Sequence, residues 1–320
     1  MLKDRDRFAV WFVLSLGCLW PVAVSGQSQV ASANDKDYRI STTTRLVLLD
    51  VGVRQPSGPF VSGLTKDDFH VFEDGKPQPI TQFANKDIPV TVGIAVDESG
   101  SMRGKRSEVL TAALGFLSSS NPQDEMFVLN FNEKVSHGLP DTVLFSDNYG
   151  QLRSALWSGT PEGRTALYDA IVAGLKQLDM GRRDKKTLIV ISDGGDNVST
   201  ATLKDVTNMV LGSLATIYTI GVYSEDDPDK NPAVLKQLAT ISGGEFYQLP
   251  KLEDVVPVCK RIAQDIRTRY TIGYIPQDTG KPIRHIKVTA SSQDHPKLVV
   301  HTRTSYRIEE GTADRSVESK

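Results

Sequence analysis

Three oxygen-bearing side chains stand at alternate positions directly after an apolar stretch. The segment VGIAVDESGSM carries Asp97, Ser99 and Ser101, whereas a turn needs only one or two such residues. This spacing lets the three side chains turn to one side of a loop, while Glu98 and Gly100 face elsewhere. We therefore expect a ligand-binding loop, with a polar cap on the following helix as the alternative.

Two later segments add oxygen ligands to this set. The apolar run LIVIS is followed directly by Asp193, and Thr165 stands where a glycine-bearing loop opens a helix. The carboxyl ends of the strands of an open α/β sheet lie at one edge, so the three loops should converge there. Oxygen ligands without nitrogen or sulfur select a hard divalent cation. Mg²⁺ is the first expectation, and Mn²⁺ and Ca²⁺ are the alternatives.

Other polar residues near these segments fit simpler roles. Asp196 and Asn197 are expected to be loop polar groups, and Asp169 a solvated or capping helix residue. The acidic segment 224–231 resembles a calcium loop, but Pro228 and the missing terminal glutamate favour a solvated loop.

Familiar catalytic motifs are missing from the sequence. It has no Gly-x-Ser-x-Gly elbow and no Gly-x-x-x-x-Gly-Lys phosphate loop, and no histidine stands near the acidic cluster. A metal-assisted hydrolase could still use Asp97 and Asp193, but Glu98, the nearest general base, is expected to point away. We therefore expect no catalytic residue and no enzyme, with hydrolysis kept as an alternative.

The elements that position these residues follow from the hydrophobic pattern. Apolar strands without period-two alternation alternate with helical stretches over residues 88–268. This pattern predicts the α/β class, with a doubly wound, mostly parallel sheet. Segments 43–85 and 269–308 contain strands and turns without helices. We expect them to form one small β-sandwich-like unit in which the α/β domain is inserted, with two separate β appendages as the alternative.

The ends of the chain have a different character. Residues 1–26 have a charged head, an apolar middle and a small-residue exit, which is typical of a secretory signal peptide. An uncleaved anchor, or a lipoprotein lipidated at Cys18, is the alternative. A linker is predicted over 27–42 and a disordered tail over 309–320. The protein is therefore expected to be exported, to the periplasm, the cell envelope or the medium.

Composition narrows the possible partners. The chain has 320 residues, a net charge of −2 and no block of Lys and Arg, which argues against nucleic acid as a partner. With 39% hydrophobic residues it can bury a large core.

Cys259 is the only cysteine beyond the signal segment. It lies at helical spacing among apolar residues, so it is expected to be a core residue rather than a reactive thiol.

The oxygen-bearing residues also resemble a known site. Asp97-x-Ser99-x-Ser101, followed by Thr165 and Asp193, is similar to the metal-ion-dependent adhesion site of von Willebrand factor type A domains. The resemblance covers about residues 88–268. The whole chain also resembles bacterial exported proteins described as VWFA-related, many of them from Acidobacteria. In those proteins a sequence similar to GLTKDDFHVFEDGKPQ precedes the domain, and a Tyr-x-x-Gly-Tyr strand follows it, here at residues 270–274.

The resemblance implies a role for each residue of the site. Ser99 and Ser101 would bind the cation directly, and Thr165 directly or through water. Asp97 and Asp193 would act through water or as hydrogen-bond acceptors. The ligand would be a Glu or Asp side chain of a partner protein, so the protein would be an adhesion-type binding module. A metal-independent scaffold of the cell envelope is the alternative.

One residue departs from the family pattern. Arg164 precedes Thr165 at a position where many relatives have glycine. It would either crowd the site or attract an acidic ligand.

Overall fold

The computed structural model describes residues 46–308 except 224–226, 250–253, 278–280 and 296. The predicted signal peptide (1–26), linker (27–42) and tail (309–320) lie outside these residues. In the part of the chain that the structure describes, no helix is long and apolar enough to cross a membrane.

The central sheet has six strands in the order β10-β9-β8-β5-β6-β7. These strands are β5 (Val90–Asp97), β6 (Glu125–Phe131), β7 (Val135–His137), β8 (Lys185–Ser192), β9 (Thr216–Gly221) and β10 (Phe246–Gln248). All neighbouring pairs are parallel except β6 and β7. Every residue of β5 is buried, as expected for a central parallel strand covered on both faces.

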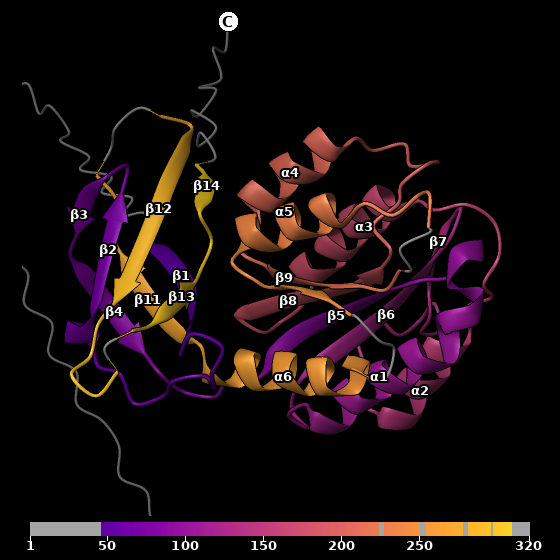
Figure 1. The fold of residues 1–320 in the computed structure, drawn as a ribbon, viewed down its shortest axis with the longest axis horizontal. Helices are drawn as coiled ribbons and strands as arrows, with labels where there is room; N and C mark the ends of the chain where they lie inside the picture. The colour runs from indigo at the N-terminus through magenta and orange to yellow at the C-terminus, as the bar shows by residue number, and fades with distance from the viewer. Residues whose placement is uncertain (1–45, 224–226, 250–253, 278–280, 296, 309–320) are drawn as a thin grey trace, which may run out of the picture. The chain divides into compact units, whose positions relative to one another are not determined.

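Helices cover both faces of this sheet (Figure 1). They are α1 (Arg106–Ser119), α2 (Tyr149–Trp157), α3 (Leu167–Asp179), α4 (Leu203–Gly212), α5 (Pro232–Ser242) and α6 (Val255–Thr268). Helices α3, α4 and α5 lie on one face, and α1, α2 and α6 lie on the other (Figure 1). The predicted α/β class with a doubly wound, mostly parallel sheet is therefore confirmed.

Local sequence signals set several helix ends. Thr202 and Asp205 form a capping box at the start of α4. Asn231 caps α5, whose first residue is Pro232, and Gly243, with a φ of 88°, follows its last residue and terminates the helix. The sequence pattern did not reveal α2 or β7. Helix α2 is only nine residues long and mostly polar in its first turn, and β7 has only three residues.

Cys259 lies on the inner face of α6. Its side chain is 1% exposed and belongs to the apolar core between helices and sheet. Burial raises the pKa of its thiol to about 12. The expectation of a core residue rather than a reactive thiol agrees with this position.

The segments on either side of the α/β domain form two antiparallel sheets, with strand orders β13-β1-β11-β4 and β14-β12-β2-β3. The strands are β1 (Val47–Arg54), β2 (Phe69–Glu73), β3 (Lys76–Gln78), β4 (Ile80–Ala84), β11 (Tyr270–Tyr274), β12 (Ile283–Ala290), β13 (Val299–His301) and β14 (Ser305–Arg307), with a short 3-10 turn, η1 (Lys66–Asp68), before β2. Each sheet combines strands from both segments. One apolar cluster takes side chains from both sheets, including Leu49, Phe69, Ile272 and Ile286.

The end of the late β segment divides between the two sheets. The stretch KLVVHTRTSYRI, residues 297–308, contains two short strands. β13 pairs with β1, and β14 pairs with β12 of the other sheet. The chain changes sheets at 302–304, where the buried side chain of Arg303 donates a hydrogen bond to the carbonyl of Ser213.

Arg269 joins the end of α6 to the first of the late strands. Its side chain is 1% exposed and forms ion pairs with Asp265 at 3.0 Å and Asp50 at 2.8 Å. It also donates hydrogen bonds to the carbonyls of Asp50 and Gly243. A single buried guanidinium therefore connects α6, β1 and the turn after α5.

Candidate functional site

Strand β5 delivers Asp97 to the carboxyl edge of the central sheet. Asp97 is the last residue of the strand and is 2% exposed. Its Oδ1 accepts a hydrogen bond from the Ser99 N–H at 2.8 Å, and its Oδ2 accepts one from the Ser192 hydroxyl at 2.7 Å. Both oxygens are thus fixed before any ligand binds.

The loop after β5 brings two hydroxyls to Asp193. The Oγ atoms of Ser99 and Ser101 lie 3.1 Å apart, and Ser101 Oγ donates to Asp193 Oδ2 at 2.6 Å. Asp193 directly follows β8, and its Oδ1 accepts a hydrogen bond from the Gly195 N–H at 2.9 Å. Residues 99, 101 and 193 are therefore brought into direct contact, as the sequence predicted.

The loop that carries Thr165 is tied to both of the other loops. The Gly100 N–H donates to the Gly163 carbonyl at 3.0 Å. On the other side, the Asn197 N–H donates to the Thr165 carbonyl at 3.0 Å, and the Thr165 N–H donates to Asn197 Oδ1 at 2.9 Å. Thr165 is buried, and backbone hydrogen bonds join its loop to the loops carrying Ser99 and Asp193.

The two buried carboxylates of this cluster repel each other. Asp97, Ser99, Thr165 and Asp193 are all at most 5% exposed, whereas Ser101 is exposed. Burial, followed by repulsion from Asp193, raises the pKa of Asp97 to about 7, although Ser192 and Ser99 donate hydrogen bonds to it. Two buried carboxylates and three hydroxyls, open to solvent at Ser101, suit a hard divalent cation, which would offset this repulsion.

Two residues outside the predicted set of site residues hold the predicted ones in place. Ser192 is fully buried, donates to Asp97 and accepts a hydrogen bond from the Gly194 N–H at 3.0 Å. Asn197, expected to be only a loop polar group, binds the backbone of Thr165 on both sides. A serine ending the apolar run LIVIS was the available signal for Ser192; nothing local marked Asn197.

The neighbouring acidic residues serve local structure. Asp196 accepts hydrogen bonds from the Tyr168 N–H and from the Ser199 hydroxyl. Asp169 accepts hydrogen bonds from the N–H groups of Thr200 and Ala201. Both tie the loop after Asp193 to the first turn of α3.

Glu98 and Arg164 have partners outside the cluster. Glu98 is 1% exposed, and its carboxylate pairs with Arg106 at 2.9 Å. Arg164 is exposed, and its Nη2 donates to the Asn197 carbonyl at 2.5 Å. Arg164 is therefore held against the loop that contacts Thr165.

Among the described residues, no group of three or more His, Cys, Asp or Glu side chains is placed to hold a metal ion.

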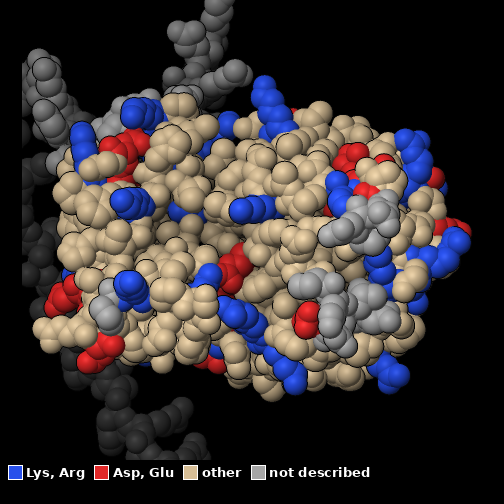
Figure 2. Space-filling view, viewed as in Figure 1, with Lys and Arg blue, Asp and Glu red and all other residues tan. Residues whose placement is uncertain are grey.

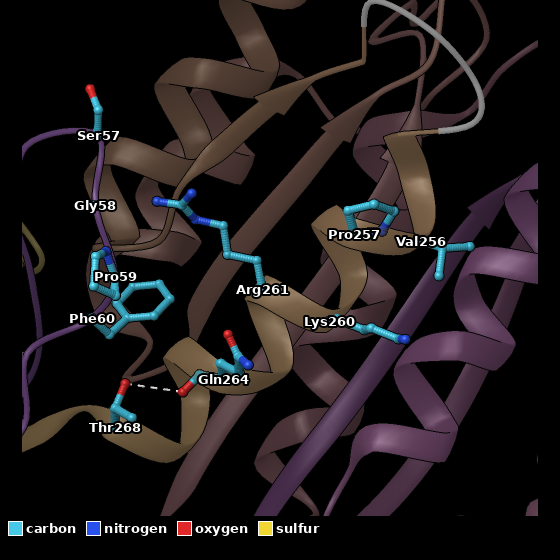
Figure 3. Close-up of a pocket in the computed structure, with 10 residues that line it drawn as sticks. All are labelled: Ser57, Gly58, Pro59, Phe60, Val256, Pro257, Lys260, Arg261, Gln264 and Thr268. Atoms are coloured by element: carbon cyan, nitrogen blue, oxygen red, sulfur yellow. Dashed lines mark hydrogen bonds between the residues drawn. The ribbon is translucent and has the colours of Figure 1, made fainter.

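One further feature of the surface lies apart from the cluster. A groove of about 810 Å³ lies between α6 and the loop Ser57–Phe60 (Figure 3). Arg261 extends across it toward Phe60, with 5.6 Å between the guanidinium carbon and the ring centre. None of the predicted site residues lines this groove.

The fold and the site together define a class of protein: an α/β domain with an oxygen-rich cluster at the carboxyl edge of its sheet. The sequence pattern of the family described as von Willebrand factor type A domain matches residues 92–195. The chain therefore contains a von Willebrand factor type A domain, and such domains commonly mediate protein–protein interactions.

Several solved structures are similar to this chain at low sequence identity. The von Willebrand factor type A protein from Catenulispora acidiphila is 13% identical, with a TM-score of 0.51 and 76% of each chain covered. The vWF domain of the type V pili tip protein Mfa5 from Porphyromonas gingivalis is 16% identical, with a TM-score of 0.47, and 57% of this chain and 96% of that one are covered. An aerotolerance-related membrane protein from Bacteroides fragilis is 16% identical, with a TM-score of 0.45, and 55% and 98% are covered. No curated protein sequence matches this chain.

Proposed function

We propose that this chain is an exported, non-enzymatic protein-binding module that uses a divalent cation to engage an acidic residue of a partner protein. Asp97, Ser99, Ser101, Thr165 and Asp193 would hold the cation, which is Mg²⁺ in the first instance. The proposal rests most heavily on the contact between Ser101 and Asp193 beside the buried Asp97.

The donor set favours binding over chemistry. Ser99 and Ser101 offer neutral oxygens, while hydrogen bonds hold Asp97 and Asp193 in place. A divalent cation held largely by neutral oxygens keeps much of its positive charge and attracts an anionic oxygen. Glu98, the acidic residue that follows Asp97 in the sequence, is paired with Arg106 and is not available as a general base.

Charge distribution supports a protein partner over nucleic acid. On the face shown in Figure 2, basic and acidic side chains are scattered among other residues rather than gathered into one basic block. The net charge of −2 agrees with this pattern.

Metal binding can be tested on the purified chain by calorimetric titration with MgCl₂ and MnCl₂. We expect one bound ion, lost in Asp97→Ala and weakened at least about tenfold in the Ser99→Ala/Ser101→Ala variant. Asp141→Asn is a matched control, because Asp141 is an exposed carboxylate outside the site. Equal metal uptake by the wild type and Asp97→Ala would refute the cation site.

Partner binding needs a separate experiment. The chain is immobilised, loaded with envelope and secreted proteins in Mg²⁺, and eluted with EDTA. We expect a partner that elutes with EDTA and is not retained by Asp97→Ala. Retention that does not change with EDTA would instead support a metal-independent scaffold. Turnover of ester or phosphate substrates that is lost in Asp193→Ala would favour the hydrolase alternative.

Export depends on residues outside the described part of the chain. We propose that residues 1–26 direct export, followed by cleavage near residue 26, and that the protein acts in the periplasm, the envelope or the medium. N-terminal sequencing of the protein recovered from cell fractions would test both points. An intact Met1 in the cytoplasmic fraction would contradict them.

A further inference from the structure

An exposed tryptophan ends the helix that leads into the Thr165 loop. Trp157 is the last residue of α2, and its side chain is 48% exposed. The guanidinium carbon of Arg106 lies 5.5 Å from the centre of the indole ring, within the range of a cation–π contact. Arg106 Nη2 also donates to the carbonyls of Trp157 at 3.2 Å and Gly159 at 2.6 Å. The guanidinium therefore fixes both the ring and the backbone that follows it.

Glu98 holds Arg106 in this position. The Nε of Arg106 donates to both Glu98 carboxylate oxygens, at 2.9 and 3.2 Å. Glu98 is 1% exposed and follows Asp97 directly in the chain. Gly159 packs so closely on Glu98 that a Cβ there would lie 2.6 Å from Glu98 Oε1. Glu98 thus holds Arg106, and Arg106 in turn holds Trp157. The indole ring is therefore supported by its neighbours and is not a mobile surface side chain.

Backbone hydrogen bonds connect this arrangement to the oxygen cluster. The Glu162 N–H donates to the Glu98 carbonyl at 2.9 Å, and the Gly100 N–H donates to the Gly163 carbonyl at 3.0 Å. The segment between Trp157 and Thr165 therefore lies against residues 98–100. Trp157 therefore directly precedes a segment that is hydrogen-bonded to the loop carrying Ser99 and Ser101.

We propose that Trp157, held by Arg106, forms a second contact for the partner segment that supplies the carboxylate. It would select an aromatic or other large apolar side chain within a few residues of the Glu or Asp. Tryptophan and arginine are the residue types that most often dominate binding energy at protein interfaces, and a ring already held in place loses little side-chain entropy on binding. The proposal rests on the proposed function, because the same partner segment must reach the cation.

The test uses synthetic peptides as probes. The reference is fluorescein-labelled Gly-Ser-Gly-Glu-Gly-Ser-Gly, and a panel replaces one Gly or Ser at a time with Phe. Affinities for the full chain are measured by anisotropy in Mg²⁺ and in EDTA. We expect at least one Phe peptide to bind about tenfold more tightly than the reference in Mg²⁺. Trp157→Ala should remove this advantage while still binding Mg²⁺ and the reference peptide as the wild type does.

A matched control and a direct reporter are available. Tyr149 is 47% exposed at the opposite end of α2, so Tyr149→Ala removes an equally exposed aromatic ring from the same helix and should keep the advantage. Trp157 is one of three tryptophans. In a Trp11→Phe/Trp20→Phe chain it is the sole tryptophan, and the unlabelled Phe peptide should change its emission only in Mg²⁺.

The outcomes separate the two ideas. Mg²⁺-dependent binding that is equal across the panel, or an advantage that survives Trp157→Ala, would overturn the role of Trp157 and leave the proposed function standing. Binding of the reference peptide that is equal in Mg²⁺ and EDTA, or undetectable in both, would overturn the proposed function and this inference with it.

Discussion

The hydroxyl of Ser101 donates a 2.6 Å hydrogen bond to Asp193 Oδ2, although the two residues lie 92 positions apart in the chain. β5 and β8 are parallel neighbours, so their carboxyl ends bring the two following loops to the same edge. This contact joins the first and third loops of the candidate site. It brings two of the proposed cation ligands together, and the predictions about metal binding start from it.

Mg²⁺ should stabilise the folded protein. A ligand that binds only the folded state raises the free energy of unfolding by about 2.7 kcal/mol at a concentration 100 times its Kd. We expect Tm to rise on addition of MgCl₂, to return to its starting value with EDTA, and to be insensitive to Mg²⁺ in Asp97→Asn. Differential scanning calorimetry measures all three. An equal rise in Asp97→Asn would place the ion elsewhere.

Ser192→Ala should weaken metal binding without touching a proposed ligand atom. The Ser192 hydroxyl orients Asp97 Oδ2 and accepts from the Gly194 N–H, and loss of such supporting hydrogen bonds typically costs about 10- to 100-fold in metal affinity. Calorimetric titration gives the affinity. Ser242→Ala is the control, because Ser242 is also buried and hydrogen-bonded but lies at the end of α5. Similar losses in both variants would indicate general destabilisation instead.

Glu245 should make stability depend on acid pH. Burial raises its pKa, but hydrogen bonds from His301, Tyr247 and Arg54, together with the charge of His301, outweigh burial and lower the pKa to about 2, from 4.5. A carboxyl group with a lowered folded-state pKa binds fewer protons when folded. Its contribution, on the order of 2 kcal/mol, is therefore present above about pH 4.5 and lost as the pH falls toward 2.

Urea unfolding of the wild type and Glu245→Gln between pH 3 and pH 7 would measure this contribution. The difference in the free energy of unfolding should be largest at pH 5–7 and shrink toward pH 3. Glu162→Gln, which changes an exposed carboxylate, should leave the profile unchanged. A difference that stays constant with pH would contradict the assignment.

Glu73→Gln should strongly destabilise the protein. Glu73 is 2% exposed, pairs with Arg284 at 2.9 Å, and accepts hydrogen bonds from the hydroxyls of Tyr274 at 2.6 Å and Tyr306 at 2.8 Å. Removing one partner of a buried ion pair costs about 3–5 kcal/mol, because the remaining charge stays buried. Tyr306→Phe removes only one neutral donor and should cost about 1–2 kcal/mol. Urea denaturation distinguishes these losses; equal effects would show that the charge of Glu73 is not decisive.

Much of this protein follows from its sequence alone. Apolar runs without alternation identified the parallel strands, because strands covered on both faces need no polar side. Asp97, Ser99 and Ser101 stood out because their spacing is local, and Thr165 and Asp193 because each follows a recognisable strand or loop. Asp74 and Gly75, both with positive φ, form the turn between β2 and β3, and the dipeptide Asp-Gly is the local signal for such a turn.

Tertiary structure decided the rest. Helix α2 has a weak apolar pattern, and the stretch containing β13 and β14 divides because pairing with two different sheets outweighs its local strand propensity. The support of Asp97 by Ser192, of Thr165 by Asn197 and of Trp157 by Arg106 connects residues 32–95 positions apart. Such contacts depend on how loops pack at the edge of the sheet, and no local spacing encodes them. The sequence thus named the oxygens that could hold a cation, and the packing of the folded chain determined which residues hold those oxygens in place.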